Sequence, residues 1–310
     1  MLTERILIIG GTGFIGRNFL NLCIERGFSC TVISLNNVEK NTQKKNVKYL
    51  TSDLADANSI SKVLKSCRPF HYVVNLSGYI DHISFFGGGK NIIETHFVGV
   101  INLLMGLDRS LLKCFVQVGS SDEYGNLAPP QCETYRESPI SPYSFSKLAL
   151  TNLFQMLERT ESFPAVVLRL FLVYGDGQDE QRFIPQVIKA CLNNKEFPVS
   201  KGEQLRDFCH VQDIARGILL AMQTKSAIGE VINLASGVPI EIKKMIQKVQ
   251  AIIKGGSPLF GSFPYRSSEN MALYADINKA RKIINWHPSI GIDEGLNRTI
   301  KFYENQLKQS

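Results

Sequence analysis

Residues 120–147 carry several side chains that could transfer protons to or from a small molecule. Tyr143 and Lys147 lie four residues apart, so a helix would place both side chains on one face. A free tyrosine has a pKa near ~10, and a nearby cation lowers it, which allows proton exchange with a carbonyl or hydroxyl near neutral pH. Ser120 and the carboxylate of Asp122 begin the same segment. The spacing therefore predicts an acid–base pair with a lowered tyrosine pKa.

A second segment with chemical potential is GGTGFIG at residues 10–16. It follows an apolar run that is typical of a strand, and it opens a helical pattern at Phe14. Gly10, Gly13 and Gly16 would let the chain turn sharply and let the backbone approach a pyrophosphate, while the helix start offers free N–H groups. This context predicts a dinucleotide cofactor site, and an oxidised nicotinamide ring bound there would act together with Lys147 to lower the pKa of Tyr143.

Cofactor choice depends on the residues after the second predicted strand. Ser34 is followed by the neutral Asn36 and Asn37, where an NAD site usually has an acidic residue for the ribose 2′-hydroxyl. The missing negative charge favours NADP over NAD, although no arginine stands there to bind the 2′-phosphate. Asp53 could accept a hydrogen bond from the adenine amino group or serve as a turn residue, and both alternatives stay open.

Apolar runs alternate with helical patterns through the first half of the chain. Such runs are typical of strands buried on both faces of a parallel sheet, and they occur at residues 5–10, 30–34, 46–50, 71–76, 114–119, 165–170 and 230–236. A helical stretch from Phe14 to Arg26 ends at Gly27, a candidate left-handed cap. The fold class predicted is α/β, a doubly wound parallel sheet of Rossmann type with a smaller C-terminal lobe.

The rhythm of strands and helices breaks after Tyr174, which predicts two lobes. Residues 1–174 and 209–236 would form the dinucleotide-binding domain, and residues 175–208 and 237–310 the smaller, substrate-binding lobe. Ligands of such sheets lie at the carboxyl ends of the strands, so the second lobe is expected to cover that edge.

Composition narrows the range of partners. The 310 residues carry a net charge of +7, but the basic residues are scattered, which argues against nucleic acid or membrane binding and favours an anionic small molecule. Seven widely spaced cysteines, without a metal-type cluster, indicate reduced thiols of a cytoplasmic protein and no metal site. No apolar run reaches the length of a membrane span.

Two predicted helices, residues 92–107 and 145–157, are too apolar to face both a sheet and solvent. Their additional apolar surface needs a second partner, which predicts a homodimer that packs through these helices. The alternative is extra coverage by the smaller lobe.

With these motifs in place, the chain resembles the extended short-chain dehydrogenase/reductase family, in its NAD(P)-dependent nucleotide-sugar epimerase/dehydratase branch. The resemblance runs along the whole chain and rests on GGTGFIG (10–16), SDL (52–54), NLSG (75–78), VGSSDEYG (118–125), SPYSFSK (141–147), LRLFLVYGDGQ (168–178), RFIPQ (182–186), GEQLRDFCHVQDIA (202–215) and PYRSSENMALYADINKAR (264–281). It implies a nucleotide-diphosphate sugar as the substrate, in the biosynthesis of sugar or polysaccharide precursors.

The resemblance also implies roles for single residues. Tyr143 would relay the proton, Lys147 would hold the ribose and support Tyr143, and Ser120 would hydrogen-bond the sugar oxygen. The cofactor would be bound by Tyr143 and Lys147 and by a set of residues along the strand ends: Gly10, Gly13, Phe14, Ile15, Gly16, Ser34, Asp53, Leu54, Leu76, Ser77 and Gly78. The substrate would be bound by Ser121, Arg182, Arg206, Arg266 and Glu269.

The sequence departs from the family pattern at His96, which stands where the family typically has asparagine. We interpret His96 as a helix residue with a satisfied imidazole. Residues 79–90 are expected to form a loop that can contact the substrate, and His82 is a candidate contact residue in that loop.

The reaction depends on Asp122. Tyrosine, lysine, serine and a nicotinamide support hydride transfer at C4 of the sugar, as a 4-ketoreductase or a 4-epimerase. A 4,6-dehydratase needs a further acid and base beside the serine, and Asp122 could serve as a shortened equivalent. The segment GSSDEYG is most similar to reductases of GDP-4-keto-6-deoxymannose, and Glu123 is expected not to be catalytic. A non-catalytic dinucleotide-binding sensor is the remaining alternative, which the intact Tyr143–Lys147 pair disfavours.

Overall fold

The computed structural model describes residues 3–265 and 269–308. Its centre is a seven-stranded sheet in the order β10-β6-β5-β4-β1-β2-β3, in which every neighbouring pair is parallel. The strands are β1 (Arg5–Ile9), β2 (Ser29–Ser34), β3 (Lys48–Thr51), β4 (Tyr72–Asn75), β5 (Cys114–Ser120), β6 (Ala165–Leu170) and β10 (Val231–Leu234). All seven predicted runs form strands of this sheet, which confirms the doubly wound α/β fold.

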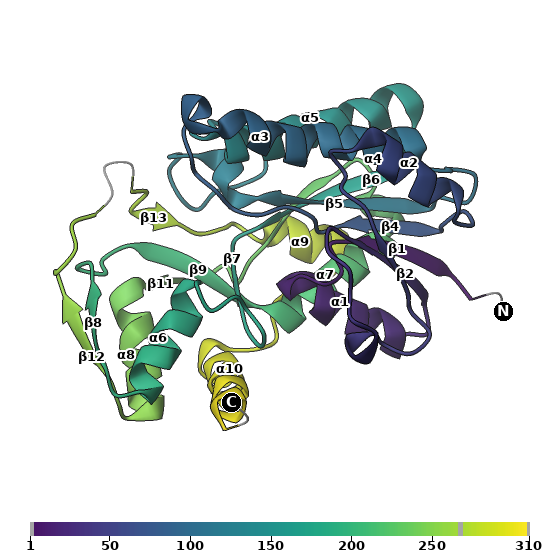
Figure 1. Ribbon diagram of the computed structural model, residues 1–310. Helices are drawn as coiled ribbons and strands as arrows, with labels where there is room; N and C mark the ends of the chain where they lie inside the picture. Colours follow the sequence, from purple (N-terminus) through teal and green to yellow (C-terminus); the bar gives the residue numbers. More distant parts are fainter. Residues whose placement is uncertain (1–2, 266–268, 309–310) are drawn as a thin grey trace.

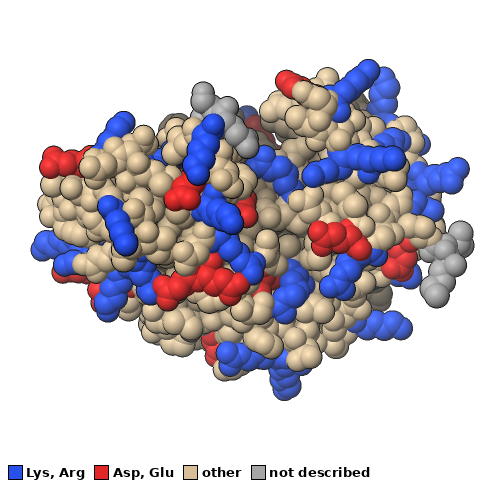
Figure 2. Space-filling model, turned by 90° about the horizontal axis from the view of Figure 1, so that it is seen from below, with Lys and Arg blue, Asp and Glu red and all other residues tan. Residues whose placement is uncertain are grey.

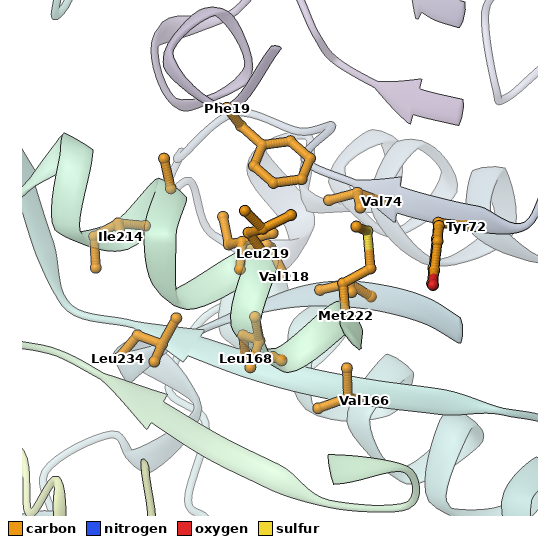
Figure 3. Packing of buried hydrophobic residues seen from close by; sticks show 14 of the residues in the cluster. Phe19, Tyr72, Val74, Val118, Val166, Leu168, Ile214, Leu219, Met222 and Leu234 are labelled. Carbon is orange, nitrogen blue, oxygen red and sulfur yellow. The ribbon is translucent and has the colours of Figure 1, made fainter. Parts of the chain in front are cut away.

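Helices cover both faces of the sheet (Figure 1). One face is covered by α1 (Phe14–Glu25) and α7 (Val211–Gln223). The other is covered by α2 (Ala57–Lys65), α4 (Gly99–Gly106) and α5 (Pro142–Glu161). Figure 3 shows the first of these interfaces, where Phe19 of α1 and Leu219 of α7 pack onto strand residues such as Val74. Burying apolar side chains on both faces fixes the sheet and therefore the edge that carries the site.

The predicted end of the first helix is confirmed. After α1, Gly27 has a φ of +79°, and its N–H donates to the carbonyl of Ile24. A left-handed backbone at this position favours glycine because it has no side chain to clash.

Two smaller sheets lie beside the large one. In the first, β11 (Pro239–Glu241), β9 (Leu205–His210) and β13 (Ala272–Leu273) pair in that order, and β7 (Leu172–Tyr174) also pairs with β9. In the second, β12 (Ser257–Phe260) pairs with β8 (Glu196–Val199). The helices of this part are α6 (Phe183–Leu192), α8 (Ile242–Ile253), α9 (Asn278–Ile284) and α10 (Ile292–Leu307). The division into two lobes at the expected boundaries stays a prediction.

The remaining elements are short. Within the described residues, 3₁₀ turns cover Lys40–Thr42, Phe85–Gly87, Ser121–Tyr124 and Lys225–Ala227. The helix expected at residues 92–107 consists of α3 (Gly89–Ile93), a π-helical turn (Glu94–Val98) and α4. A π-turn inside a helix is rare and often occurs at a functional site.

The two apolar helices leave large side chains exposed. Met105 of α4 is 83% exposed, and Phe145 of α5 is 51% exposed. The homodimer through these helices stays a prediction.

Charged side chains of both signs lie on the face shown in Figure 2, where lysines and arginines are spread widely. None of the described helices has the length and apolarity to cross a membrane. In residues 3–265 and 269–308, no three histidine, cysteine or acidic side chains form a group that could hold a metal ion. The seven cysteines are unpaired.

Candidate active site

The parallel sheet brings the predicted site residues to one edge. Carboxyl ends of parallel strands meet at the same side, and a crevice forms where the strand order reverses, here between β1 and β4. The segment GGTGFIG at residues 10–16, called the glycine turn below, follows β1. Leu76 follows β4, and Ser120 ends β5. Residues far apart in the chain therefore meet above this edge.

The glycine turn is too tight for side chains. A Cβ on Gly16 would lie 2.2 Å from the carbonyl oxygen of Gly10, and Gly10 itself has a φ of +73°. Gly13 is the N-cap of α1 and provides no side-chain cap, so the first N–H groups of the helix face outward. Phe14 and Ile15 are the first helical residues and are half-buried. The turn thus fits a pyrophosphate, which needs a close backbone approach and free N–H donors.

The other predicted cofactor residues lie along the same edge. Ser77 donates from both its N–H and its hydroxyl to Asn75 Oδ1, which fixes the turn before Gly78. Asp53 Oδ1 accepts from the N–H of Ala55, so Asp53 is a turn residue, and its contact with adenine remains a prediction. Leu54 is buried in the core beneath α4.

A pocket of about 470 Å³ lies between the glycine turn and the end of β2. It is lined by Gly11, Asn36 and Asn37, and also by the cations Arg17 and Lys44. The expectation that no arginine lies near this position is therefore wrong, because α1 carries Arg17 to it. The guanidinium of Arg17 donates to the carbonyl of Gly177 at 2.8 Å. Ser34 does not line the pocket; its hydroxyl donates to the carbonyl of Asn36 at 2.9 Å.

Asn36→Asp should lower the affinity for NADP relative to NAD about tenfold, because a carboxylate repels the 2′-phosphate. The dissociation constants of both cofactors can be measured by protein fluorescence. Asn36→Ala is the control, since it removes the amide without adding charge. An unchanged ratio in Asn36→Asp would show that this pocket does not hold the adenosine ribose.

The start of α5 positions the acid–base pair. Ser141 caps the helix and accepts from the N–H of Ser144, and Pro142 occupies the first turn, where its missing N–H costs nothing. Lys147 is buried, donates to the carbonyl of Val118 at 3.1 Å, and places Nζ 5.8 Å from the centre of the Tyr143 ring. Burial lowers the pKa of Lys147 to about 8.

The protein's own groups raise the pKa of Tyr143. Burial and the negative charge of Asp122 raise it above the ordinary tyrosine value, and a hydrogen bond with Ser120 only partly opposes this shift. The expected lowering depends on Lys147 together with an oxidised nicotinamide ring, so it stays a prediction. Proton exchange near neutral pH then requires additional positive charge at the site.

Ser120 and Asp122 face Tyr143 from the end of β5. The hydroxyl of Ser120 accepts from the N–H of Asp122 at 3.1 Å. Asp122 Oδ2 lies 3.6 Å from His82 Nε2, and the His82 ring lies edge-on to the Tyr143 ring. Burial raises the pKa of Asp122, and the nearby His82 partly opposes this rise. The loop at residues 79–90 thus brings His82 to the site.

His96 lies behind the pair in the π-helical turn. Its ring is edge-on to Tyr143, with 5.3 Å between ring centres, and burial lowers its pKa to about 3. The expectation of a satisfied imidazole is wrong for Nε2, which is buried without a hydrogen-bond partner among the described residues. A Cβ on Gly78 would lie 2.4 Å from this ring.

Four of the five predicted substrate residues can be described. Ser121 is buried beside Ser120. Arg206 forms an ion pair with Glu269, and its positive charge opposes the raised pKa of Asp122. Arg182 is the N-cap residue of α6; its charge also acts on Asp122 and Tyr143, although its own side chain is exposed. Arg266 lies outside the described residues.

Sequence reasoning missed a buried charge cluster beneath Ser120. Glu123, which is expected not to be catalytic, is fully buried and accepts from the N–H of Ser120 and from Nε of Arg169, both at 2.8 Å. Arg169 is also fully buried and pairs with Glu137. One signal was available: an arginine in a strand predicted to be buried on both faces requires a buried carboxylate.

Comparisons with known proteins agree with this geometry. The model of the NAD dependent epimerase/dehydratase family matches residues 6–235. A UDP-glucuronate 4-epimerase of Thermodesulfobacterium geofontis is 26% identical over 97% of both chains. A dTDP-glucose 4,6-dehydratase of Neisseria gonorrhoeae is 26% identical over 97% of this chain and 95% of its own. A UDP-glucose 4-epimerase of Thermotoga maritima, crystallised with UDP-glucose, aligns with a TM-score of 0.88 at 25% identity, over 98% of this chain and all of that one. The chain therefore belongs to the NAD dependent epimerase/dehydratase family.

Proposed function

We propose that the protein catalyses oxidation and reduction at C4 of a nucleotide-diphosphate sugar. The observation that carries this proposal is the convergence of Ser120, Tyr143 and Lys147 at the sheet edge beside the glycine turn. Of the two C4 reactions, 4-epimerisation is favoured over 4-ketoreduction, because several relatives are named as sugar 4-epimerases.

In the proposed reaction, Tyr143 takes the proton of the sugar 4-hydroxyl while the hydrogen on C4 leaves as hydride. A nicotinamide cofactor held by the glycine turn and Lys147 would supply the hydride acceptor and, in its oxidised form, positive charge near Tyr143. Such charge would oppose burial and the Asp122 carboxylate, which raise the pKa of Tyr143. The hydroxyl of Ser120 donates a hydrogen bond to the C4 oxygen, and Tyr143 returns the proton in the reverse step.

The substrate diphosphate would lie over Arg206 and Arg182. Arg206 is paired with Glu269, so the diphosphate would replace that carboxylate as its partner. An exchange of one anion for another costs less than burying an unpaired phosphate, because the guanidinium stays paired in both states.

Two kinds of substrate distinguish the C4 reactions. The purified enzyme should be incubated with UDP-, dTDP- and GDP-hexoses and, separately, with their 4-keto-6-deoxy forms, and the products identified by NMR. An epimerase converts a parent sugar to its C4 isomer without net cofactor consumption, whereas a reductase consumes NADPH with the keto sugar. If no sugar reacts at C4, the proposal fails.

The second candidate function is 4,6-dehydration, which the Asp122–His82 contact favours. The raised pKa of Asp122 suits a proton donor, and His82 places a second side chain of acid–base type 3.6 Å from it. In this reaction the pair would serve elimination across C5–C6.

Asp122→Asn separates the two functions. Epimerisation should continue within about tenfold of the wild type, because proton transfer at C4 belongs to Tyr143. A 4-keto-6-deoxy product from the wild type, lost in Asp122→Asn, would instead assign the dehydratase. His82→Gln is the matched variant and should follow the same pattern.

A further inference from the structure

We propose that Glu123 is a positioning residue whose buried carboxylate holds Ser120 and Lys147 in the arrangement that serves Tyr143. This inference rests on the proposed function for its catalytic consequence. The arrangement itself can be tested without a substrate.

The carboxylate lies directly beneath the end of β5. Oε1 accepts from the N–H of Ser120 at 2.8 Å, and a Cβ on Gly119 would lie 2.4 Å from this oxygen. Glycine at 119 therefore leaves the space that the carboxylate fills. Together with the hydrogen bond from the Asp122 N–H, this contact fixes the backbone and hydroxyl of Ser120.

The second oxygen connects β5 to α5. Oε2 accepts from the hydroxyl of Thr151 at 2.7 Å, and that hydroxyl also lies 3.2 Å from the carbonyl of Lys147. Lys147 returns to the strand through its bond to the carbonyl of Val118. The strand that carries Ser120 and the helix that carries Lys147 are thus joined through one buried carboxylate.

The charge of Glu123 acts on both members of the acid–base pair. Burial lowers the pKa of Lys147, and the Glu123 carboxylate opposes that shift by favouring the ammonium form. Burial raises the pKa of Tyr143, and Glu123 adds to that shift. Removing the negative charge should therefore lower both pKa values.

Other charged groups face the pair and remain in place, but Glu123 also raises the pKa of Asp122, so removing its charge should lower the Asp122 pKa as well. Asp122 and Arg182 face Tyr143, and His96 faces Lys147. His96 stays neutral at neutral pH because its pKa is low. Arg169 faces Glu123 itself.

The competing explanation is that Glu123 merely neutralises Arg169. Glu137 offers a matched control, because it pairs with Nη2 of the same guanidinium. Glu123→Gln and Glu137→Gln each leave Arg169 with one carboxylate. Gln also keeps an oxygen that can accept from the Ser120 N–H. Glu123→Gln therefore removes the negative charge but can keep this hydrogen bond.

The titration of Lys147 is the direct readout. It can be followed by NMR in protein labelled at lysine side chains, with the signal identified by its absence from Lys147→Met. We expect the midpoint near 8 to fall by about one unit in Glu123→Gln and to stay unchanged in Glu137→Gln. The pH profile of kcat should move toward lower pH in Glu123→Gln alone.

Two further variants keep the test decisive if Glu123→Gln does not fold, and separate the charge of Glu123 from its reach to Ser120. Glu123→Gln combined with Arg169→Gln removes both buried charges, so it should fold if the single variant does not, and its Lys147 midpoint should still be low. Glu123→Asp keeps the charge but shortens the reach to Ser120, so it should lower kcat with little shift of the midpoint.

Equal midpoints in Glu123→Gln, Glu137→Gln and the wild type would overturn the proposal and leave Glu123 a partner of Arg169 only. If the wild type converts no nucleotide sugar, the proposed function fails, while the Lys147 titration still decides the role of the carboxylate.

Discussion

Tyr143→Phe should lower kcat about 10²- to 10⁴-fold, the usual contribution of a positioned acid–base group. Phenylalanine keeps the ring that packs against His82 and His96 but has no proton to exchange. Cofactor affinity should fall far less than kcat, because the glycine turn, the start of α1 and Lys147 are untouched. Turnover and cofactor binding can be measured on the same preparation.

Tyr303→Phe is the matched control for this substitution. Tyr303 is also a buried tyrosine; it belongs to α10, and its hydroxyl donates to the carbonyl of Gln178. Its loss should affect stability and leave kcat near the wild-type value. Retained turnover in Tyr143→Phe would remove Tyr143 from the proposed reaction.

Arg169→Met should reduce the free energy of unfolding by about 3–5 kcal/mol, the usual cost of removing one partner from a buried ion pair. The substitution leaves Glu123 buried without its cation, and Glu137 loses the same partner. It also removes a cation that lies 4.6 Å from the centre of the Tyr124 ring. Urea denaturation followed by circular dichroism measures this loss.

Arg109→Met is the corresponding surface control. The pair between Arg109 and Glu161 spans 3.6 Å with both side chains more than half exposed, so its removal should cost far less. If the two variants unfold at the same urea concentration, the buried cluster does not contribute as argued.

The strands and the glycine turn could be predicted because their signals are local. A run such as that of β6 is apolar at nearly every position, and such a run is stable only when buried on both faces. Gly10 and Gly16 are required by the turn itself. The spacing of Tyr143 and Lys147 depends only on the geometry of one helix.

The rest depends on contacts between distant residues. Arg169 lies in β6 and Glu123 in the 3₁₀ turn that follows β5, so the role of Glu123 is not visible from its neighbours in the chain. The contact of His82 with Asp122 depends on the path of an irregular loop. The direction of the Tyr143 pKa shift depends on how deeply α5 is buried, which periodicity does not measure.

The proposed reaction requires that a hydride leave C4 and return to it. A nucleotide sugar carrying deuterium at C4 follows this hydride, when the reaction runs in ordinary water and the product is identified by NMR. For the proposed epimerase we predict that the isomer retains deuterium at C4 and that none is exchanged with solvent. Loss of the label to water, or its appearance at C6 as in a 4,6-dehydration, would rule out hydride return at C4.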